Sequence, residues 1–396
     1  MRFRVIVFLL IATVVGAGVS AQDLQPLTFL LTFVPNVQFS PLYIAIEKGY
    51  FADVGLDVTI EHLDEPVVVD LIAAGQRQFG MVSGEEVIKA RAKGRPIVYT
   101  YAWFHRYPVG IVAPEGTGIE SVADLAGRKV GIPGRFGASY NGLITLLAAN
   151  GLTEDDIQLE PIGFNAPENF CKGIVEASVV YINNEPLQIQ SRADMGDCGD
   201  VKQVQVFPVA DVSALVSNGI VTSEAVLADN PELVRRVITA YDRGLRDAIL
   251  YPAEAYTIAT KYVENLPLPP VLAQLALWEQ TVIGGMTAAA PPTVVGDRLN
   301  ALLGTAEPAS EEMTPRARAA QYREALPELL IDLAEPVELL QFRVLLSTIA
   351  LWDADVLGQT TLEAWQATQD ILLQTGQLKA PIALEAAFTN AFIPGE

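Results

Sequence analysis

The sequence predicts an α/β protein of two lobes, joined by two crossing segments with a cleft between the lobes. Short apolar stretches alternate with helical stretches along the first part of the 396 residues, and the alternation restarts near Val109. Strands separated by helices indicate a parallel sheet whose two faces are both covered. After Ala225 the chain reads as helices without a sheet of their own. We therefore expect these helices to pack onto the first lobe, which makes the second lobe an insertion.

The first lobe begins with a buried strand, "PLTFLLTF" from Pro26. A helix opens at Pro41 and ends before Gly49, and "LDVTIEH" from Leu56 alternates apolar and polar residues, as a half-buried strand does. Helix, strand, helix and strand then follow in the segment 67–104. This order of elements is that of an α/β unit.

The second lobe repeats this alternation of strands and helices. Its strands are expected in "PVGIVAP", "GRKVGIPG", "DIQLEPIGF", "SVVYINNE" and "VKQVQVFPVAD", and its helices in "ASYNGLITLLAANG" and "APENFCKGIVEA". With crossings near residues 109–112 and 211–215, lobe 1 comprises residues 22–111 plus 213–396, and lobe 2 comprises residues 112–212. Strand ends from both lobes meet at the cleft, where ligands bind in open α/β folds. Residues 284–315, rich in Pro, Ala, Gly and Thr, are expected to form an irregular insert.

The first 21 residues are typical of an export signal. Arg2 and Arg4 precede an apolar run from Val5 to Val15, and small residues end the segment at Ala21, as cleavage requires. An uncleaved anchor is the alternative. We expect an exported protein, in the periplasm or on the outer face of the cell membrane.

The charge of the chain excludes one class of partner. There are 26 Lys and Arg against 47 Asp and Glu, a net charge of −21. Removal of residues 1–21 takes away two arginines and no acid, which leaves 24 − 47 = −23. A protein so acidic repels phosphates, so we expect no nucleic-acid partner.

Histidine and cysteine are too sparse for a metal or catalytic constellation. His62 and His105 are the only histidines, so no metal site, no Ser-His-Asp triad and no cofactor is expected. Cys171 and Cys198 are the only cysteines, and an exported protein can join them in a disulfide. Two free thiols are the alternative.

Five stretches place polar and aromatic side chains at strand ends that would face the cleft. They are "PNVQFSPLY", "MVSGEEV", "YAWFHRYP", "GIPGRFGASYNG" and "VVYINNEP". Free N–H groups at glycine turns and helix starts favour polar ligand atoms, and aromatic faces stack on planar rings. The candidate ligand-binding residues are Asn36, Phe39, Tyr43, Ser83, Glu85, Trp103, Tyr107, Phe136, Gly137, Ser139, Tyr181, Asn183 and Glu185.

Each of these stretches also has an ordinary structural interpretation. "PNVQFSPLY" can be a connecting loop with a helix-starting proline, and Ser83 with Glu86 fits a capping box. The aromatics of "YAWFHRYP" can belong to the core, and Asn183-Asn184 before a proline can be a turn. The glycine turn lacks the lysine of a P-loop and the spacing of a dinucleotide fingerprint.

These motifs resemble the solute-binding proteins of bacterial ABC importers, in the branch shared by sulfonate, nitrate and thiamine-precursor binders. The resemblance rests on "PNVQFSPLYIAIEKGYF", the Ser-Gly-Glu at 83–85, "SVADLAGRKVGIPG" and "INNEP", and covers residues 27–283 and 336–393. It implies the type II periplasmic-binding-protein fold and a ligand clamped between the lobes. It also implies a monomer without catalytic activity that delivers its ligand to an ABC permease with its ATPase.

Within this branch, "VPNVQFSPLY", "GIPGRFGASY" and "VYINNEP" are most similar to riboflavin-binding members. Pyrimidine-binding relatives have a histidine where Phe39 stands, and a pyrimidine-synthesising enzyme of the superfamily also needs a cysteine-rich motif that is missing here. The resemblance therefore implies riboflavin, with a thiamine-precursor pyrimidine as the alternative and an enzyme as the least favoured class.

On this interpretation the candidate residues divide by the part of riboflavin that each would contact. Those expected to sandwich the ring system are Phe39, Trp103 and Tyr107; those expected to pair with its polar edge are Asn36, Asn183 and Glu185; and those expected to take the ribityl hydroxyls are Ser139 and the backbone near Gly137.

Overall fold

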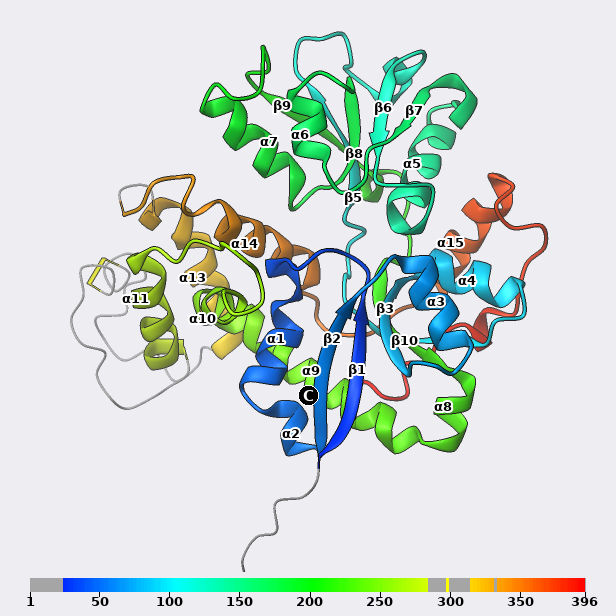
Figure 1. Cartoon of the computed structure of the whole chain (residues 1–396), viewed down its shortest axis with the longest axis vertical. Coiled ribbons are helices and arrows are strands. Elements are labelled where there is room, and N and C mark those ends of the chain that lie inside the picture. The colour runs from blue at the N-terminus through cyan, green and yellow to red at the C-terminus, as the bar shows by residue number, and fades with distance from the viewer. Residues whose placement is uncertain (1–23, 284–296, 299–313, 331–332, 396) are drawn as a thin grey trace, which may run out of the picture.

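The computed structural model describes residues 24–283, 297–298, 314–330 and 333–395, and these form two lobes, one above the other in Figure 1. The expected signal segment, residues 1–21, and most of the expected irregular insert, residues 284–315, lie outside the described residues. Within them, no helix is both long and apolar enough to cross a membrane.

The sheet of the first lobe has the strand order β2-β1-β3-β10-β4. Its strands are β1 Gln25–Leu31, β2 Leu56–His62, β3 Phe79–Ser83, β4 Ile97–Ala102 and β10 Asn218–Ser223. β1 is parallel to β2 and to β3, and its register sets Gln25 opposite Leu56 and Leu31 opposite His62. β10 is antiparallel to both β3 and β4.

The sheet of the second lobe has the order β7-β6-β8-β5-β9. Its strands are β5 Val109–Pro114, β6 Lys129–Ile132, β7 Gln158–Pro161, β8 Ala177–Tyr181 and β9 Val204–Pro208. β6 is parallel to β7 and β8, whereas β5 is antiparallel to β8 and β9.

The prediction of parallel sheets is therefore wrong for one strand in each lobe. The reversed strands are β5, the first strand after the crossing into lobe 2, and β10, the first strand after the crossing back. β4 ends at the cleft, so β5 must start there and run away from it. β10 likewise starts at the cleft, with Asn218, and runs opposite to its neighbours.

Helices cover both faces of the first sheet. Their bounds are α1 Ser40–Glu47, α2 Tyr50–Asp53, α3 Glu65–Ala73, α4 Gly84–Ala92, α8 Glu224–Asp229, α9 Pro231–Leu250, α10 Pro252–Ala259, α11 Pro270–Trp278, α13 Pro315–Leu330, α14 Leu340–Trp352 and α15 Leu362–Gln374. Neighbouring side chains of a strand point to opposite faces, so Phe29 and Leu31 pack in the core with α1, α9, α10 and α14, whereas Leu30 packs with α3, α4 and α15.

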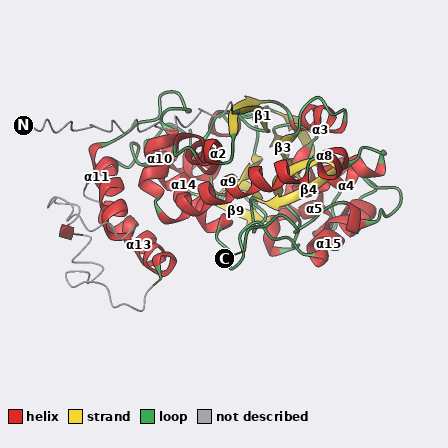
Figure 2. Cartoon of the chain, turned by 90° about the horizontal axis from the view of Figure 1, so that it is seen from below, coloured by secondary structure: helices red, strands yellow, loops and turns green. Residues whose placement is uncertain are grey.

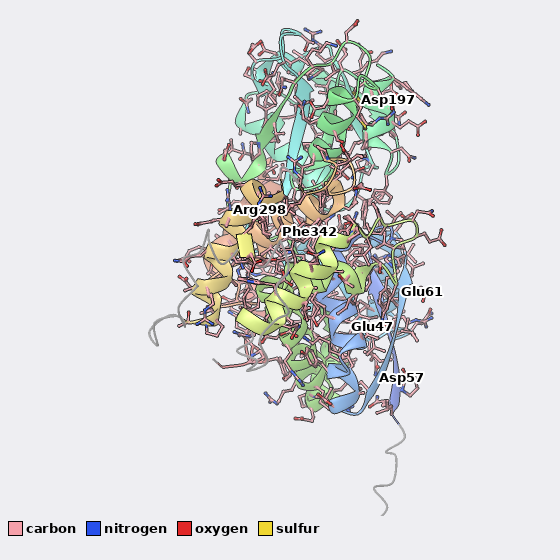
Figure 3. The ribbon with its side chains drawn as sticks, turned by 90° about the vertical axis from the view of Figure 1, so that its left-hand side faces the viewer. Glu47, Asp57, Glu61, Asp197, Arg298 and Phe342 are labelled. Atoms are coloured by element: carbon pink, nitrogen blue, oxygen red, sulfur yellow. A yellow bond between two sulfur atoms is a disulfide. The ribbon has the colours of Figure 1, made fainter. Side chains whose placement is uncertain are left out.

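The helices that follow β10 extend the core of lobe 1. Figure 2 shows α10, α11, α13 and α14 gathered on one side of the strands, with α4 and α15 on the other. Phe342 of α14, labelled in Figure 3, is fully buried and meets Tyr256 of α10 edge to face, with ring centroids 5.6 Å apart. α14 also contacts lobe 2 through α7 (Glu185–Asp194), so it borders the space between the lobes.

Lobe 2 contains three α-helices in the described residues, α5 Gly137–Ala149, α6 Ala166–Cys171 and α7 Glu185–Asp194. Cys171, the last residue of α6, is joined by a disulfide to Cys198, which is buried in the segment before β9. The bond closes a loop with a sequence separation of 27 residues. A cross-link of this length stabilises a fold chiefly by restricting the unfolded chain.

Replacing both cysteines by alanine is therefore expected to lower the free energy of unfolding by about 3 kcal/mol. Urea unfolding without reductant measures the loss. A reductant is the matched control, because it should bring the wild-type protein down to the double variant and leave the double variant unchanged. Equal stability of the oxidised wild type and the variant would contradict the expectation.

Candidate ligand-binding site

A cavity of about 60 Å³ lies between the two lobes. Both lobes line it, lobe 1 from the ends of β1 and β4 and the starts of α3 and β10, and lobe 2 from the start of α5, the end of β8 and the loop after β7. The residues that line it include Phe33, Phe39, Glu65, Trp103, Asn218, Phe136, Gly137, Ser139, Phe164, Tyr181 and Glu185.

Two stacked aromatic rings form the wall of the cavity in lobe 1. Phe39 ends a short 3₁₀ turn, Val37–Phe39, which Asn36 caps by accepting a hydrogen bond from the backbone N–H of Gln38 at 3.0 Å. Trp103 directly follows β4, and its ring lies 5.3 Å from that of Phe39 at an interplanar angle of 25°. Its buried Nε1–H has no hydrogen-bond partner among the described residues. The wall therefore offers one unused donor.

The lobes are in close contact where Gly137, the first residue of α5, meets Glu65, the first residue of α3. Glu65 accepts a hydrogen bond from the backbone N–H of Ser83 at 2.6 Å, and the N–H of Gly137 donates to Glu86 at 3.1 Å. Gly137 has φ +63°, and a Cβ at this position would lie 2.0 Å from Oε2 of Glu65. Only glycine fits both the backbone conformation and the contact.

Hydrogen bonds from the end of β8 also cross between the lobes. The hydroxyl of Tyr181 donates to Oδ1 of Asn218 at 2.8 Å. The amide of Asn183 donates to Gln38 at 3.0 Å and to Thr348 of α14 at 2.7 Å. These contacts, with those of Gly137, hold the lobes closed around the cavity.

Glu85 and Tyr107 form a buried pair beneath the cavity. The Tyr107 hydroxyl contacts both the carboxyl of Glu85 and, at 2.9 Å, the carbonyl oxygen of Ala138. One O–H can donate to only one of these acceptors. The hydroxyl therefore donates either to the Glu85 carboxyl or to the Ala138 carbonyl oxygen. Burial raises the pKa of Glu85 to about 7.

Two further carboxyls at the site have raised pKa values. Burial, and next the neighbouring Glu86 carboxylate, raises the pKa of Glu65 to about 8. Burial raises the pKa of Glu185 to about 7, although this carboxylate accepts the backbone N–H of Tyr181 at 2.9 Å. In the described residues no group of three or more His, Cys, Asp and Glu side chains could hold a metal ion. The site is therefore aromatic and polar, with carboxyls whose pKa values burial raises.

The structure brings some of the predicted residues together and separates others. Those that line the cavity are Phe39, Trp103, Phe136, Gly137, Ser139, Tyr181 and Glu185. Those that lie outside its lining are Asn36, Tyr43, Ser83, Glu85, Tyr107 and Asn183. Most of these form hydrogen bonds to residues that line the cavity or to their neighbours. Tyr43 instead points into lobe 1, where its ring stacks on that of Tyr262 with the centroids 4.1 Å apart.

Sequence reasoning missed Phe33, Glu65, Phe164 and Asn218, which all line the cavity. Phe33 follows β1 and Glu65 follows β2, so the rule that ligands bind at the ends of parallel strands could have found both. Asn218 starts the antiparallel strand β10, and the rule for the ends of parallel strands does not reach the first residue of such a strand.

A sequence model of the family described as NMT1/THI5 like matches residues 36–255. The chain is 29% identical over 391 residues to the riboflavin-binding protein RibY of Chloroflexus aurantiacus, an alignment that covers 97% of this chain and 90% of that protein. It is 24% identical over 245 residues to the 4-amino-5-hydroxymethyl-2-methylpyrimidine phosphate synthase of Legionella pneumophila, which covers 61% of this chain and 75% of the synthase.

Solved structures show the same fold at low identity. The ligand-binding component of an ABC-type import system from Staphylococcus aureus superposes with a TM-score of 0.56 at 10% identity, over 93% of this chain and 98% of that chain. The periplasmic aliphatic sulphonate binding protein SsuA from Escherichia coli gives a TM-score of 0.50 at 18% identity, over 64% and 83% of the two chains. The predicted fold, that of two-lobed periplasmic binding proteins, is confirmed.

The contact between Gly137 and Glu65 predicts that Gly137→Ala forces the lobes apart. The added Cβ would overlap Glu65, so the radius of gyration measured by small-angle scattering should increase. Gly151, at the other end of α5, is the matched control, because it also has a positive φ, +73°, but has nothing within 4 Å of an added Cβ. Gly151→Ala should strain the backbone without changing the radius of gyration. Equal radii for the two variants would contradict the role given to Gly137.

The buried carboxyls predict a pH dependence of stability. The pKa of Glu65 is raised from 4.5 to about 8 on folding, so between these values the folded state binds more protons than the unfolded state. The free energy of unfolding should therefore fall as the pH rises from about 5 to about 8. Glu65→Gln, which keeps an acceptor for Ser83, should flatten this fall, whereas Glu363→Gln on the surface should not. Urea unfolding at several pH values measures the slope, and an unchanged slope in Glu65→Gln would contradict the assignment.

Proposed function

Because the chain belongs to the NMT1/THI5-like family, we propose that it is the extracytoplasmic solute-binding component of an ABC importer, which captures riboflavin and delivers it to a membrane permease with its ATPase. The observation that carries the proposal is the cavity between the lobes, walled by aromatic rings and buried polar groups. The similarity to the riboflavin-binding protein RibY, which extends over nearly the whole chain, supports the choice of ligand.

In this proposal the isoalloxazine ring of riboflavin stacks against the cavity-facing side of the Phe39–Trp103 pair. Phe39 and Trp103 stack on each other, so a ligand ring cannot lie between them, and their outer surface is what a flat ring can cover. Phe136 lines the cavity from lobe 2 and can close over the other face of the ring. Offset stacking of this kind contributes about 0.5 to 1.5 kcal/mol per ring pair. The polar edge of the ring meets Glu185 and Asn218, where unpaired groups would cost about 1 to 3 kcal/mol each.

Binding requires the lobes to move. The cavity of about 60 Å³ is smaller than the roughly 300 Å³ at which ordinary ligand pockets begin. Two chain segments connect the lobes, residues 103–108 and 209–217, and such crossings allow hinge opening. A ligand that touches both lobes favours the closed state. We propose that the lobes move as two units, residues 22–111 with 213–396 and residues 112–212, with β5 (Val109–Pro114) spanning the first boundary.

Binding without catalysis fits the residues of the site. His105 lies outside the cavity, where burial lowers its pKa to about 4, and both cysteines are in the disulfide. His62 contacts the carbonyl oxygen of Phe33, and burial lowers its pKa. His62 is thus held by a backbone carbonyl and His105 lies away from the cavity, which supports a binding protein rather than a pyrimidine-synthesising enzyme.

A thiamine-precursor pyrimidine is the second candidate ligand. The small closed cavity favours it, because a single pyrimidine ring needs less space than an isoalloxazine. The similarity to a pyrimidine phosphate synthase over 245 residues also favours a pyrimidine ligand. The carrier function proposed here would be unchanged.

We further propose a cellular location and an oligomeric state for the protein. Residues 1–21 serve as an export signal, and the protein works as a monomer in the periplasm or on the outer face of the cell membrane. The acidic charge of −21 accords with the expected absence of nucleic acid among its partners.

Riboflavin fluorescence should be quenched on binding, and Phe39→Ala should weaken the affinity about tenfold, which corresponds to about 1.4 kcal/mol. The matched control is Tyr43→Phe, because Tyr43 lies outside the cavity lining and should leave the affinity unchanged. A wild-type protein that leaves riboflavin fluorescence untouched at micromolar concentration, yet binds an aminopyrimidine, would contradict the ligand and retain the carrier function.

A further inference from the structure

A second hollow, of about 320 Å³, lies directly outside the cavity. The two spaces share three lining residues, Phe33, Phe164 and Glu185. Phe33 of lobe 1 and Phe164 of lobe 2 meet edge to face, with ring centroids 4.9 Å apart and an interplanar angle of 85°. This aromatic pair stands at the junction of the two spaces, so its rings must part for one ligand to occupy both.

Amide side chains from both lobes line the outer hollow. Lobe 1 supplies them from the loop after β1, the segment after α10 and the helix α14, and lobe 2 supplies them from the start of α7. The five amides are Asn36, Asn184, Gln188, Asn265 and Gln341. An amide both donates and accepts hydrogen bonds, as a hydroxyl group does. Five of them around one hollow are suited to a chain of hydroxyls.

Several of these amide groups are free to bind a ligand. Asn184 is occupied, since it accepts from Gln188 at 2.7 Å and donates to Glu185 at 3.2 Å. Among the described residues, the side chains of Gln341 and Asn265 and the oxygen of Gln188 make no hydrogen bond.

Asn265 has a second distinguishing feature. It has φ +56°, and it is the only non-glycine residue of the described chain with a positive φ. Such a conformation costs energy, although asparagine tolerates it better than most residues, and strained residues cluster at ligand-binding sites.

The charge of the outer hollow restricts its ligand further. Its lining contains Glu185 and Glu264 but no Lys, Arg or His. A phosphate or carboxylate in this hollow would find no cationic side chain to pair with. The hollow therefore suits an uncharged chain.

We propose that the outer hollow is the subsite for an uncharged, polyhydroxylated chain attached to a flat heterocycle, with Phe33 and Phe164 clasping the junction between ring and chain. This proposal rests on the proposed function and refines it, because it places the ribityl chain of riboflavin outward, against Gln188 and Gln341. The rival placement is inward, against Ser139 in the cavity.

The test compares three flavins on the full-length protein. Riboflavin has the ring and the chain, lumiflavin has the ring without the chain, and flavin mononucleotide has a phosphate on the chain. Gln188→Ala and Gln341→Ala should each weaken riboflavin binding about three- to tenfold and leave lumiflavin binding unchanged. Gln366→Ala, an exposed amide on α15, is the matched control and should affect neither ligand. Flavin mononucleotide should bind the wild type at least tenfold more weakly than riboflavin.

The outcomes separate this proposal from the function on which it rests. If both flavins bind but the glutamine variants weaken them equally or not at all, the subsite is wrong and the carrier function stands. If Ser139→Ala selectively weakens riboflavin, the chain points inward. If flavin mononucleotide binds as tightly as riboflavin, the chain need not be uncharged. If neither riboflavin nor lumiflavin binds the wild type, both the ligand assignment and the subsite fall.

Discussion

The reversed direction of β5 and β10 is the constraint on which the architecture of the site depends. Each is the first strand after a crossing, so each starts at the cleft, while the strands beside it end there. This arrangement makes the carboxyl ends of both sheets face one another, with loops and helix starts from both lobes at the same place. Asn218, the first residue of β10, reaches the cavity for this reason and receives the hydrogen bond of Tyr181 from lobe 2.

Closure of the lobes and the chemistry of the cavity are coupled through buried carboxyls. Glu65 bonds to Ser83 within lobe 1 while it contacts Gly137 of lobe 2, and Glu185 lines both the cavity and the outer hollow. Burial raises the pKa of both groups. A carboxyl accepts hydrogen bonds in its charged form and can also donate one in its neutral form. A neutral heterocycle with a donor–acceptor edge suits such groups.

Much of the fold could be predicted because hydrophobic periodicity marks strands and helices locally. "LDVTIEH" is β2 residue for residue, and the helix expected from Pro41 is α1 with one residue added. Periodicity carries no information on strand direction, so it could not show that β5 and β10 run opposite to their neighbours. It also identifies residues that follow a strand without showing how deeply each is buried. Tyr43 follows the loop after β1, yet the helical turn after Pro41 points it into the core. Contacts between lobes, such as Gly137 with Glu65, depend on tertiary placement that no local pattern encodes.

The central claim is that the cleft holds a flavin. The most direct measurement is mass spectrometry of the small molecule released by denaturing protein purified from its own host, together with the absorbance spectrum of the protein before release. We expect flavin bands in the spectrum and the mass of riboflavin in the released fraction, at up to one molecule per chain. Release of an aminopyrimidine or a sulfonate at that ratio, from protein without flavin absorbance, would contradict the account.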